Sequence, residues 1–472
     1  MRTSLQRRES EPNREVSSAT VRPAAKAKRV LIISSHFPPE RAAGVHRILR
    51  LVNQLRTAAW PVAVLTVDPQ YYRAGTPVDE SLGDRLPDGV QVYRTKVVRG
   101  LTAAAFWRRQ LARSVSGAAR RLFKPAIRKS SKHDPLRITK TAPQKRPMVD
   151  GEIGWLLPAI RQGTTIVRRH KPEIIFSSAP PFTCHLIAAW LARRHSIRWV
   201  ADFRDPWARS PWKRAELTDS WWKGRFRQWL ERLVIEKADV VLLNTSSLHD
   251  EFAAHYGRRI ARKFYTVTNG YDADVLTPYL HLARPRSSRL VLTHAGSLYR
   301  QRDPRPLVRA VASAIAKGRI AADGIELNFV GTVSPQFHLA ETIGDLKLGP
   351  AVRLTLPVDH ERSLQHLVES DVLIVIQPGT GVQVPVKLYE YLPFRKPILA
   401  LAPSGALSTI VEDSGLGLVV DPDDADALED AICHLYEHRH QLAERFRANA
   451  AYIAKFDGAV VSRQLQRILE SL

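Results

Sequence analysis

The chain has 472 residues, with 71 Lys and Arg against 46 Asp and Glu, and a formal net charge of +25. Hydrophobic residues make up 44% of it, which excludes wholesale disorder, and the length suffices for two or three domains. The two cysteines, Cys184 and Cys433, exclude a disulfide framework and fit a reducing compartment. No apolar run approaches the roughly 18–20 residues that cross a bilayer, and the N-terminus lacks a signal-peptide core, so we expect a cytoplasmic protein.

The excess positive charge is concentrated in two segments. Residues 1–29 hold eight Lys and Arg against three Glu, and we expect residues 1–28 to form a disordered basic tail. Residues 101–149 hold thirteen Lys and Arg against the single acidic residue Asp134, so the two segments supply +17 of the net charge. A strongly basic chain suggests nucleic acid or an anionic membrane as partner. Because the remaining chain is only mildly basic, nucleic acid is not expected.

The segment 101–149 begins with the pattern of a basic amphipathic helix. Its apolar residues recur every three or four positions, while arginines fill much of the remaining surface: Trp107, Leu111, Val115, Ala118 and Leu122. A helix of this kind can lie in the headgroup layer of an anionic membrane. An ordinary surface helix packed on a core explains the pattern equally well, and the sequence leaves both open.

Short runs of Val, Ile and Leu alternate with helical patterns from residue 29 onward. The first series of runs lies at 29–35, 61–67, 172–178, 197–203 and 239–244, and a second at 289–296, 325–331, 352–356, 371–377 and 396–402. Runs that are apolar throughout are typical of parallel strands buried on both faces, and the alternation implies right-handed crossovers. We therefore predict an α/β protein with two Rossmann-like, doubly wound parallel-sheet domains that face a cleft.

The boundaries of these domains follow from the two series of strands. We place the N-terminal domain at 29–272, with the basic segment 101–149 as an insertion, and the C-terminal domain at 273–455. Residues 456–472 form a last helical pattern, which we expect to pack back on the N-terminal domain. Ligands of doubly wound sheets bind beyond the carboxyl ends of the strands, so the loops there hold the candidate residues.

In the first half, two such loops carry chemistry. Gly44 falls where a helix follows the first strand, which lets a ligand approach free backbone N–H groups. A G-x-G-x-x-G motif is absent from this loop, so a dinucleotide cofactor is not expected. Asp202, Arg204 and Asp205 end a later strand, where two carboxylates and a guanidinium are costly unless paired or facing a substrate. One Asp–Arg pair would explain a single carboxylate and leave the other for function.

In the second half, Gly296 ends a strand and is followed by Arg300 and Arg302, a composition that suits phosphate oxygens. The segment 379–401 (GTGVQVPVKLYEYLPFRKPILAL) places Lys387 near the start of a helix and Glu390 one turn further on. A carboxylate can accept hydrogen bonds from two neighbouring hydroxyls, as a ribose presents them. A Lys–Glu pair at this spacing is also an ordinary surface feature, but its position between two buried strands points it to the cleft.

Several of these motifs together resemble a known family. FPP with AG and Arg near the N-terminus, NGYD at the domain join, HAGSLY, and PVKLYEYL followed by KPILA are similar to GT-B-fold glycosyltransferases of the family-four type. The SSAPP and ADFRDPW stretches, with Gly154 and Trp155 upstream, most resemble bacterial members of exopolysaccharide and surface-glycan assembly. The resemblance covers roughly residues 29–460, and PVKLYEYL with KPILAL is its most specific part.

The resemblance implies a function and a role for each candidate residue. It implies transfer of a sugar from a nucleotide-sugar donor to a hydroxyl of a glycan or lipid-linked acceptor, with retention of configuration, without a bound metal and without a further cofactor. Glu390 would hold the ribose, while Lys387 and one of Arg300 or Arg302 would neutralise the diphosphate. The other donor-side residues would be Gly44, Gly296 and Gln383; the catalytic candidates are Asp202, Arg204 and Asp205, and the acceptor side adds His36, His46 and Arg47.

Two departures from the family pattern leave questions open. Family members often have a second Glu eight residues before the ribose-binding one, where this chain has Val382 beside Gln383, so the loop 377–383 would have to recognise the sugar. A frequent His of the acceptor side is replaced by the Asp202–Asp205 cluster, and either an Asp or the donor phosphate could take the acceptor proton. The alternatives are a nucleotide-sugar epimerase of similar architecture and a basic nucleic-acid-binding protein.

Overall fold

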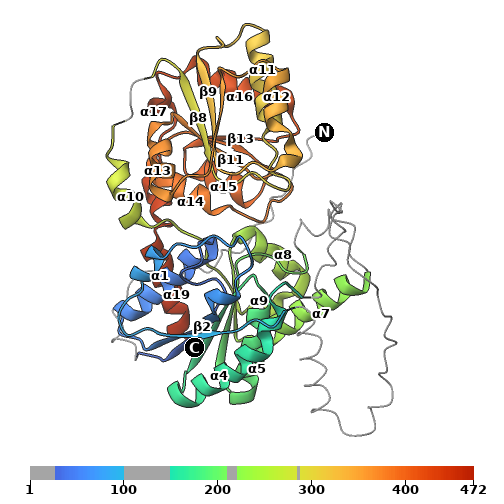
Figure 1. Ribbon diagram of the computed structural model, residues 1–472, viewed down its shortest axis with the longest axis vertical. Coiled ribbons are helices and arrows are strands. Elements are labelled where there is room, and N and C mark those ends of the chain that lie inside the picture. Colours follow the sequence, from blue (N-terminus) through green and yellow to red (C-terminus); the bar gives the residue numbers. More distant parts are fainter. Residues whose placement is uncertain (1–26, 100–148, 210–220, 284–286) are drawn as a thin grey trace, which may run out of the picture.

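The computed structural model describes residues 27–99, 149–209, 221–283 and 287–472, and these form two α/β domains stacked along the long axis (Figure 1). Each domain is built on a single sheet whose strands are all parallel, with helices on both faces. The prediction of two doubly wound domains is therefore confirmed. The predicted basic helix and all of the segment 101–149 except its last residue lie outside the described residues, as does the tail up to residue 26.

The N-terminal sheet has seven strands in the order β3-β2-β1-β4-β5-β6-β7. They are β1 (Val30–Ile33), β2 (Val62–Val67), β3 (Gln91–Thr95), β4 (Ile174–Ala179), β5 (Arg198–Phe203), β6 (Val240–Leu243) and β7 (Phe264–Thr266). The helices are α1 (Ala43–Thr57), α2 (Ser81–Asp84), α4 (Leu156–His170), α5 (Thr183–His195), α7 (Trp221–Lys237), α8 (Ser246–Tyr256) and α9 (Arg258–Ala261). Strands β1, β2 and β4 are buried along their whole length, which explains their continuous apolar sequence.

The C-terminal sheet has six strands in the order β10-β9-β8-β11-β12-β13. They are β8 (Leu290–Ala295), β9 (Ile325–Val330), β10 (Val352–Thr355), β11 (Val372–Ile376), β12 (Ile398–Leu401) and β13 (Gly417–Val420). Its helices are α11 (Arg305–Ala316), α12 (Leu339–Asp345), α13 (His360–Glu369), α14 (Val386–Tyr391), α15 (Ala406–Asp413), α16 (Ala425–Glu437), α17 (Leu442–Arg445) and α18 (Ala450–Ala454). Helix α10 (Ala273–Leu280) leads into this domain, and Leu276 is buried in its core.

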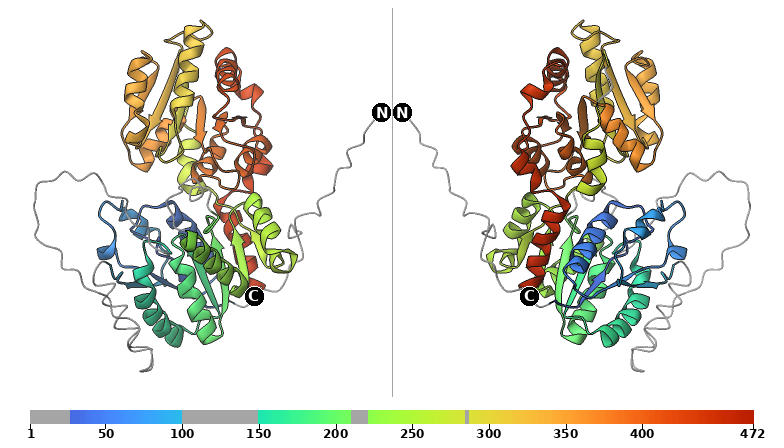
Figure 2. Two further views of the ribbon diagram at one scale, coloured as in Figure 1. Left: turned by 90° about the vertical axis from the view of Figure 1, so that its right-hand side faces the viewer. Right: turned by 90° about the vertical axis from the view of Figure 1, so that its left-hand side faces the viewer.

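The chain returns to the N-terminal domain at its end. Helix α19 (Gly458–Glu470) lies against α1 and buries Val461, Leu465 and Leu469 in the same cluster as Val30 of β1 (Figure 2). The crossing is fixed where Tyr271 donates its N–H to the carbonyl of Phe456 at 2.9 Å and accepts one from Gly458 at 2.8 Å. The two domains are thus joined by two chain crossings that lie side by side.

No helix within the described ranges is both long enough and apolar enough to span a membrane.

Candidate active site

The candidate residues of the two halves meet between the domains, in the loops that follow the carboxyl ends of the strands. Gln383, in the loop before α14, donates through Nε2 to Oδ1 of Asp205 at 2.7 Å. Next to it, Thr245 Oγ1 of the N-terminal domain donates to the carbonyl of Val382 at 2.7 Å. The loop after β5 and the loop after β11 therefore contact each other directly, as doubly wound topology predicts for a shared site.

Glu390 lies at the centre of the C-terminal side of this site. Its carboxylate is 2.8 Å from Nζ of Lys387 and 2.7 Å from Nε2 of His360, and its side chain is 17% exposed. Burial works to raise the pKa of Glu390, but Lys387 and His360 outweigh it and hold the pKa at about 2. Glu390 is therefore an anion at every physiological pH, with one face still open to a ligand.

His360 was missed by the sequence analysis. It begins α13, thirty positions before Glu390 in the chain, and no motif marks it. The only available signal was indirect, because a half-buried carboxylate beside a single Lys leaves lone pairs for a second donor. His294, near the end of β8, stands in the HAGSLY motif but was given no role by the sequence analysis; its Nδ1 lies 3.0 Å from the carbonyl oxygen of Ile374. Burial lowers the pKa of His294 to about 4, so it is neutral.

Around Glu390, the structure distinguishes the two candidate arginines. Arg302 directs Nη2 and Nε at Oε1 of Gln377, at 2.7 and 3.2 Å, and so is held at the loop after β11. Arg300 has a positive φ of 60° and an exposed side chain. Gly296 leaves room beside the Lys387 side chain, since a Cβ there would lie 3.8 Å from Cγ of Lys387. Lys387 thus lies beside Gly296, and Lys387 and Arg302 both lie near His294, whose pKa they help to lower.

Asp202 and Arg47 are brought together, but inside the N-terminal domain. Arg47 Nη2 lies 2.8 Å from Oδ1 of Asp202 and Nε lies 3.0 Å from Oδ2, while Ser178 Oγ donates to Oδ2 at 2.7 Å. Arg47 also donates to the carbonyls of Val267 and Thr268, at 3.0 and 2.6 Å. Asp202 is 0% exposed and Arg47 4% exposed. The expectation that both line the acceptor side does not agree with this geometry, since the pair has no face toward a substrate.

Arg204 and Gly44 meet at the start of α1. The guanidinium lies directly over Gly44, where a Cβ would come within 1.4 Å of Nη1, and Nη2 donates to the carbonyl of Pro180. Arg204 is 9% exposed, and its Nε has no partner among the described residues. Burial lowers its pKa, an effect that Asp202 and Asp205 oppose. A buried cation therefore sits at the positive end of a 15-residue helix whose N-cap residue, Ala42, has no side-chain acceptor.

Asp205 is the one carboxylate of the cluster that faces the other domain. Burial raises its pKa, opposed by Arg204, by the hydrogen bond from Gln383 and by Arg302. His46 lies on the same side: burial lowers its pKa, opposed by Asp272, whose Oδ2 is 3.8 Å from Nδ1, and by Glu390 across the domain boundary. His46 thus faces Glu390, and Asp205 faces Gln383 and Arg302 of the C-terminal domain.

His36 lies further out on the N-terminal side. Its Nδ1 is 2.8 Å from Oε2 of Glu40, and both residues line a cavity of about 200 Å³. Tyr72, Arg73, Arg99, Glu152 and Pro181 line the same cavity, which opens at the carboxyl ends of β1, β2 and β4. Its lining carries both signs of charge.

The chain matches two family models in tandem. Residues 43–264 match the glycosyl transferase 4-like domain, and residues 289–438 match glycosyl transferases group 1. No curated protein matches the chain in sequence.

Solved structures match the whole arrangement of the two domains. HepE from Anabaena, in complex with UDP and glucose, matches with a TM-score of 0.62 at 14% identity over 94% of this chain and 100% of that chain. Sucrose-phosphate synthase from Thermosynechococcus elongatus matches with a TM-score of 0.63 at 15% sequence identity, over 94% of this chain and 98% of that chain. A glycosyltransferase from Rickettsia africae matches with a TM-score of 0.60 at 14% identity, over 94% of this chain and 98% of that chain. At these identities the structures show the shared fold, and the two family models show the family. The chain is therefore an enzyme of the GT-B glycosyltransferases of the family-four type.

Proposed function

We propose that this glycosyltransferase uses a nucleotide-sugar donor and transfers the sugar, with retention of configuration, to a hydroxyl of a glycan or lipid-linked acceptor in bacterial surface-glycan assembly. The observation that carries the proposal is the Glu390–Lys387–His360 group, whose Lys387 lies beside Gly296, together with the contact of Gln383 with Asp205 across the domain boundary. HepE, which shares the fold, was solved with UDP-glucose, and this supports a donor of that class.

On the donor side, Glu390 would accept hydrogen bonds from the two ribose hydroxyls. A carboxylate has about four acceptor positions, so the contacts to Lys387 and His360 leave room for both. Lys387 and Arg302 would stabilise the negative charge that develops on the diphosphate as the glycosidic bond breaks. Arg302 is the better candidate of the two arginines, because Gln377 already fixes its guanidinium.

The diphosphate would also engage the start of α1. Arg204 and the first N–H groups of α1 place positive charge on both sides of Gly44, and Asp202 and Asp205 offset the burial of Arg204 only in part. Such an arrangement favours an anion that contacts both groups. Because Gly44 has no Cβ, the Arg204 guanidinium lies against the start of α1, and a phosphate oxygen beside it would reach both donors.

On the acceptor side, we assign Asp205 rather than Asp202 to the reacting hydroxyl. Asp205 would accept a hydrogen bond from that hydroxyl and orient it, while the departing phosphate oxygen takes its proton. The bond from the anomeric carbon to the phosphate oxygen breaks as the bond to the acceptor oxygen forms on the same face. Gln383, already bonded to Asp205, lies where the donor sugar and the acceptor would meet.

Binding of nucleotide sugars to the full chain tests the proposal. Titration calorimetry with UDP-glucose, other nucleotide sugars and the free nucleotides should identify at least one ligand, and Glu390→Ala should weaken it by about tenfold or more because charge-assisted hydrogen bonds are lost. Glu341→Ala, at an exposed position on α12, is the matched control. If no nucleotide sugar binds the wild type, the proposal fails. Isomerised donor formed without any acceptor would favour the epimerase alternative.

A further inference from the structure

His294 carries a buried hydrogen-bond acceptor that no group of the described residues satisfies. The residue lies near the end of β8 and is 6% exposed. Its Nδ1 lies 3.0 Å from the carbonyl oxygen of Ile374, and because that oxygen can only accept, Nδ1 carries the proton. Burial lowers the pKa of His294 to about 4, so Nε2 is unprotonated at neutral pH and can only accept. Nε2 has no partner among the described residues, whereas buried polar atoms are normally hydrogen-bonded.

This nitrogen lies on the donor side of the site. A Cβ at Gly296 would lie 3.5 Å from Nε2 of His294 and 3.8 Å from Cγ of Lys387, so the imidazole and the Lys387 side chain border the same open face of Gly296. Lys387 and Arg302 both help to lower the pKa of His294, since both cations lie near the ring. Arg302 also acts on Asp205 of the N-terminal domain. The unpartnered acceptor therefore lies beside the cations of the donor side, on the side of the domain boundary.

The end of β8 is fixed relative to α14. The N–H of Ala295 donates to Oη of Tyr391 at 2.9 Å, and the N–H of Gly296 donates to the carbonyl of Val330 at 2.8 Å. Tyr391 ends α14, the helix that also carries Glu390. The imidazole thus keeps one position relative to the residues of α14, as a residue that selects a ligand group requires.

A neutral acceptor beside two cations restricts the kind of group that can bind there. Lys387 and Arg302 are assigned to the diphosphate, whose oxygens carry no proton in a nucleotide sugar at neutral pH and cannot donate to Nε2. Glu390 is assigned to the two ribose hydroxyls. Of the hydroxyl groups of the donor, those of the transferred sugar are then left to pair with His294.

We propose that Nε2 of His294 accepts a hydrogen bond from a hydroxyl of the transferred sugar, and that His294 thereby helps to determine which sugar is used. This assignment rests on the proposed function, because it takes the diphosphate and ribose contacts from it. A sugar without that hydroxyl, or with the hydroxyl in the other configuration, leaves the acceptor buried and unpaired, which lowers affinity.

Titration calorimetry of the full chain with UDP-glucose and with UDP tests the assignment. His294→Phe keeps a planar ring without the acceptor, and it should weaken UDP-glucose about tenfold while UDP changes by less than about twofold. His294→Asn, whose amide can still donate to Ile374 but does not reach the position of Nε2, should show the same selectivity and serves if the Phe variant does not fold. If another nucleotide sugar binds better, it and its nucleoside diphosphate take the place of this pair.

Monodeoxy derivatives of the bound nucleotide sugar identify the hydroxyl. Loss of the contacted hydroxyl should weaken binding to the wild type about tenfold and should weaken binding to His294→Phe no further, because the partner is already gone. If every deoxy derivative loses the same factor with the wild type and with both variants, no sugar hydroxyl pairs with His294 and the assignment is wrong.

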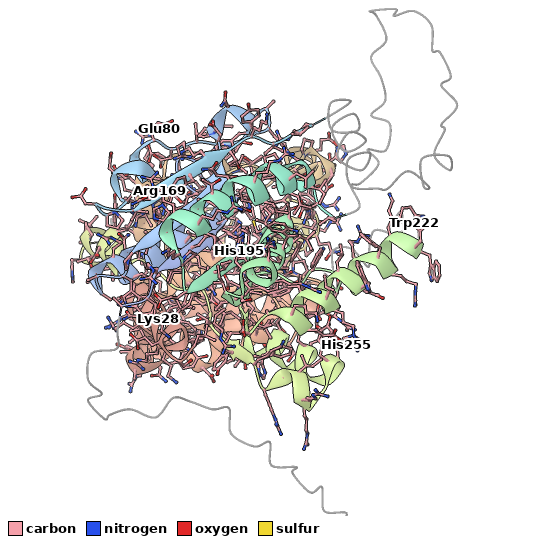
Figure 3. The ribbon with its side chains drawn as sticks, turned by 90° about the horizontal axis from the view of Figure 1, so that it is seen from below. Lys28, Glu80, Arg169, His195, Trp222 and His255 are labelled. Carbon is pink, nitrogen blue, oxygen red and sulfur yellow. The ribbon has the colours of Figure 1, made fainter. Side chains whose placement is uncertain are left out.

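His195→Phe is the matched control. His195 is also an imidazole whose Nε2 has no partner among the described residues, but it ends α5 on the side of the N-terminal domain turned away from the C-terminal domain (Figure 3). This variant should bind both ligands as the wild type does, and thermal unfolding midpoints show which variants are folded.

The remaining outcomes separate this assignment from the proposed function. Glu390→Ala should weaken UDP-glucose and UDP alike, because the ribose is common to both. If it does so while the His294 variants weaken both ligands equally, or neither, His294 contacts the nucleotide or no ligand, and only the sugar assignment is overturned. If no nucleotide sugar binds the wild type, the proposed function and the assignment fail together.

Discussion

Asp202, near the end of β5, and Asp205, in the loop after it, lie three residues apart, yet the fold gives them opposite surroundings. Asp202 ends inside the domain, with both oxygens bonded to Arg47 and Ser178. Asp205 faces the C-terminal domain and bonds to Gln383, and burial raises its pKa. The sequence thus locates a cluster of carboxylates but does not distinguish their roles. Whether a carboxylate stabilises the fold or takes part in the reaction depends on the partner that it contacts in the folded protein.

The largest expected effect is on the structural member of the pair. Arg47→Met leaves the Asp202 carboxylate buried without its cation, and we expect the free energy of unfolding to fall by about 3–5 kcal/mol. Urea unfolding measures the change. As a control, Arg198→Met at the start of the same strand breaks a pair with Asp239 in which Arg198 is 62% exposed, and it should cost about 1 kcal/mol or less. If both variants lower the free energy of unfolding equally, the Arg47–Asp202 pair stabilises the fold no more than an exposed ion pair does, and the structural role given to Asp202 is wrong.

The second effect concerns Asp205. Asp205→Asn keeps the shape and the contact to Gln383, so the protein should stay folded and donor affinity should change little, while transfer to the acceptor should fall by about a hundredfold. Turnover with the donor found by calorimetry is the readout, and Asp250→Asn, at a position 80% exposed on α8, is the control. If Asp205→Asn transfers the sugar at the wild-type rate, another group of the site orients the acceptor hydroxyl.

Glu390 extends the comparison to a third carboxylate, and its effect is read from pH. Its pKa is lowered from 4.5 to about 2, so the folded state binds this proton less readily than the unfolded state. The stabilisation of the folded state by ionised Glu390 is therefore complete above about pH 4.5 and is lost as the pH falls toward 2. Since the side chain is 17% exposed, we expect a loss of order 2 kcal/mol. Burial raises the pKa of Asp205, so the effect of Asp205 has the opposite sign: its ionisation lowers the free energy of unfolding as the pH rises.

Urea midpoints measured between pH 2.5 and 6 separate the two carboxylates. Glu390→Gln should flatten the acid side of the profile, whereas Asp205→Asn should raise stability relative to the wild type toward neutral pH. A profile that Glu390→Gln leaves unchanged would contradict the role given to Lys387 and His360.

Much of the fold could be predicted because buried parallel strands have a distinctive sequence. β1, β2, β8 and β11 are runs of Val, Ile and Leu, and each was located correctly. β3 (QVYRT) was missed, because an edge strand with half-exposed residues lacks that pattern. After α16 the chain forms two short helices, α17 and α18, since Asn449 Oδ1 accepts the N–H of Tyr452 at 3.1 Å and so begins a new helix.

The site was predictable only where its residues are close in the sequence. Lys387 and Glu390 stand one helical turn apart, so their pairing followed from spacing alone. Arg47 and Asp202 are separated by 155 positions, and the sequence suggested an Asp–Arg pair within the cluster of Asp202, Arg204 and Asp205 instead. The contact of His360 with Glu390 depends on how α13 and α14 pack within the C-terminal domain. The contact of Gln383 with Asp205 depends on how the two domains face each other. No local sequence pattern encodes either arrangement.

The smallest expected effect is at Gly44, where it isolates the role of Arg204. A Cβ at Gly44 would come within 1.4 Å of Nη1 of Arg204, so Gly44→Ala must displace the guanidinium and should weaken nucleotide-sugar binding by about tenfold. Arg204→Ala should cost a similar factor by itself. If both act through one phosphate contact, the double variant should bind about as weakly as either single variant, because the second change has nothing further to remove. Gly151→Ala is the control, because a Cβ at Gly151 would displace the Arg73 guanidinium in the same way, away from the Glu390 group. Additive losses in the same calorimetric titration would instead mean that Gly44 and Arg204 make separate contacts with the ligand.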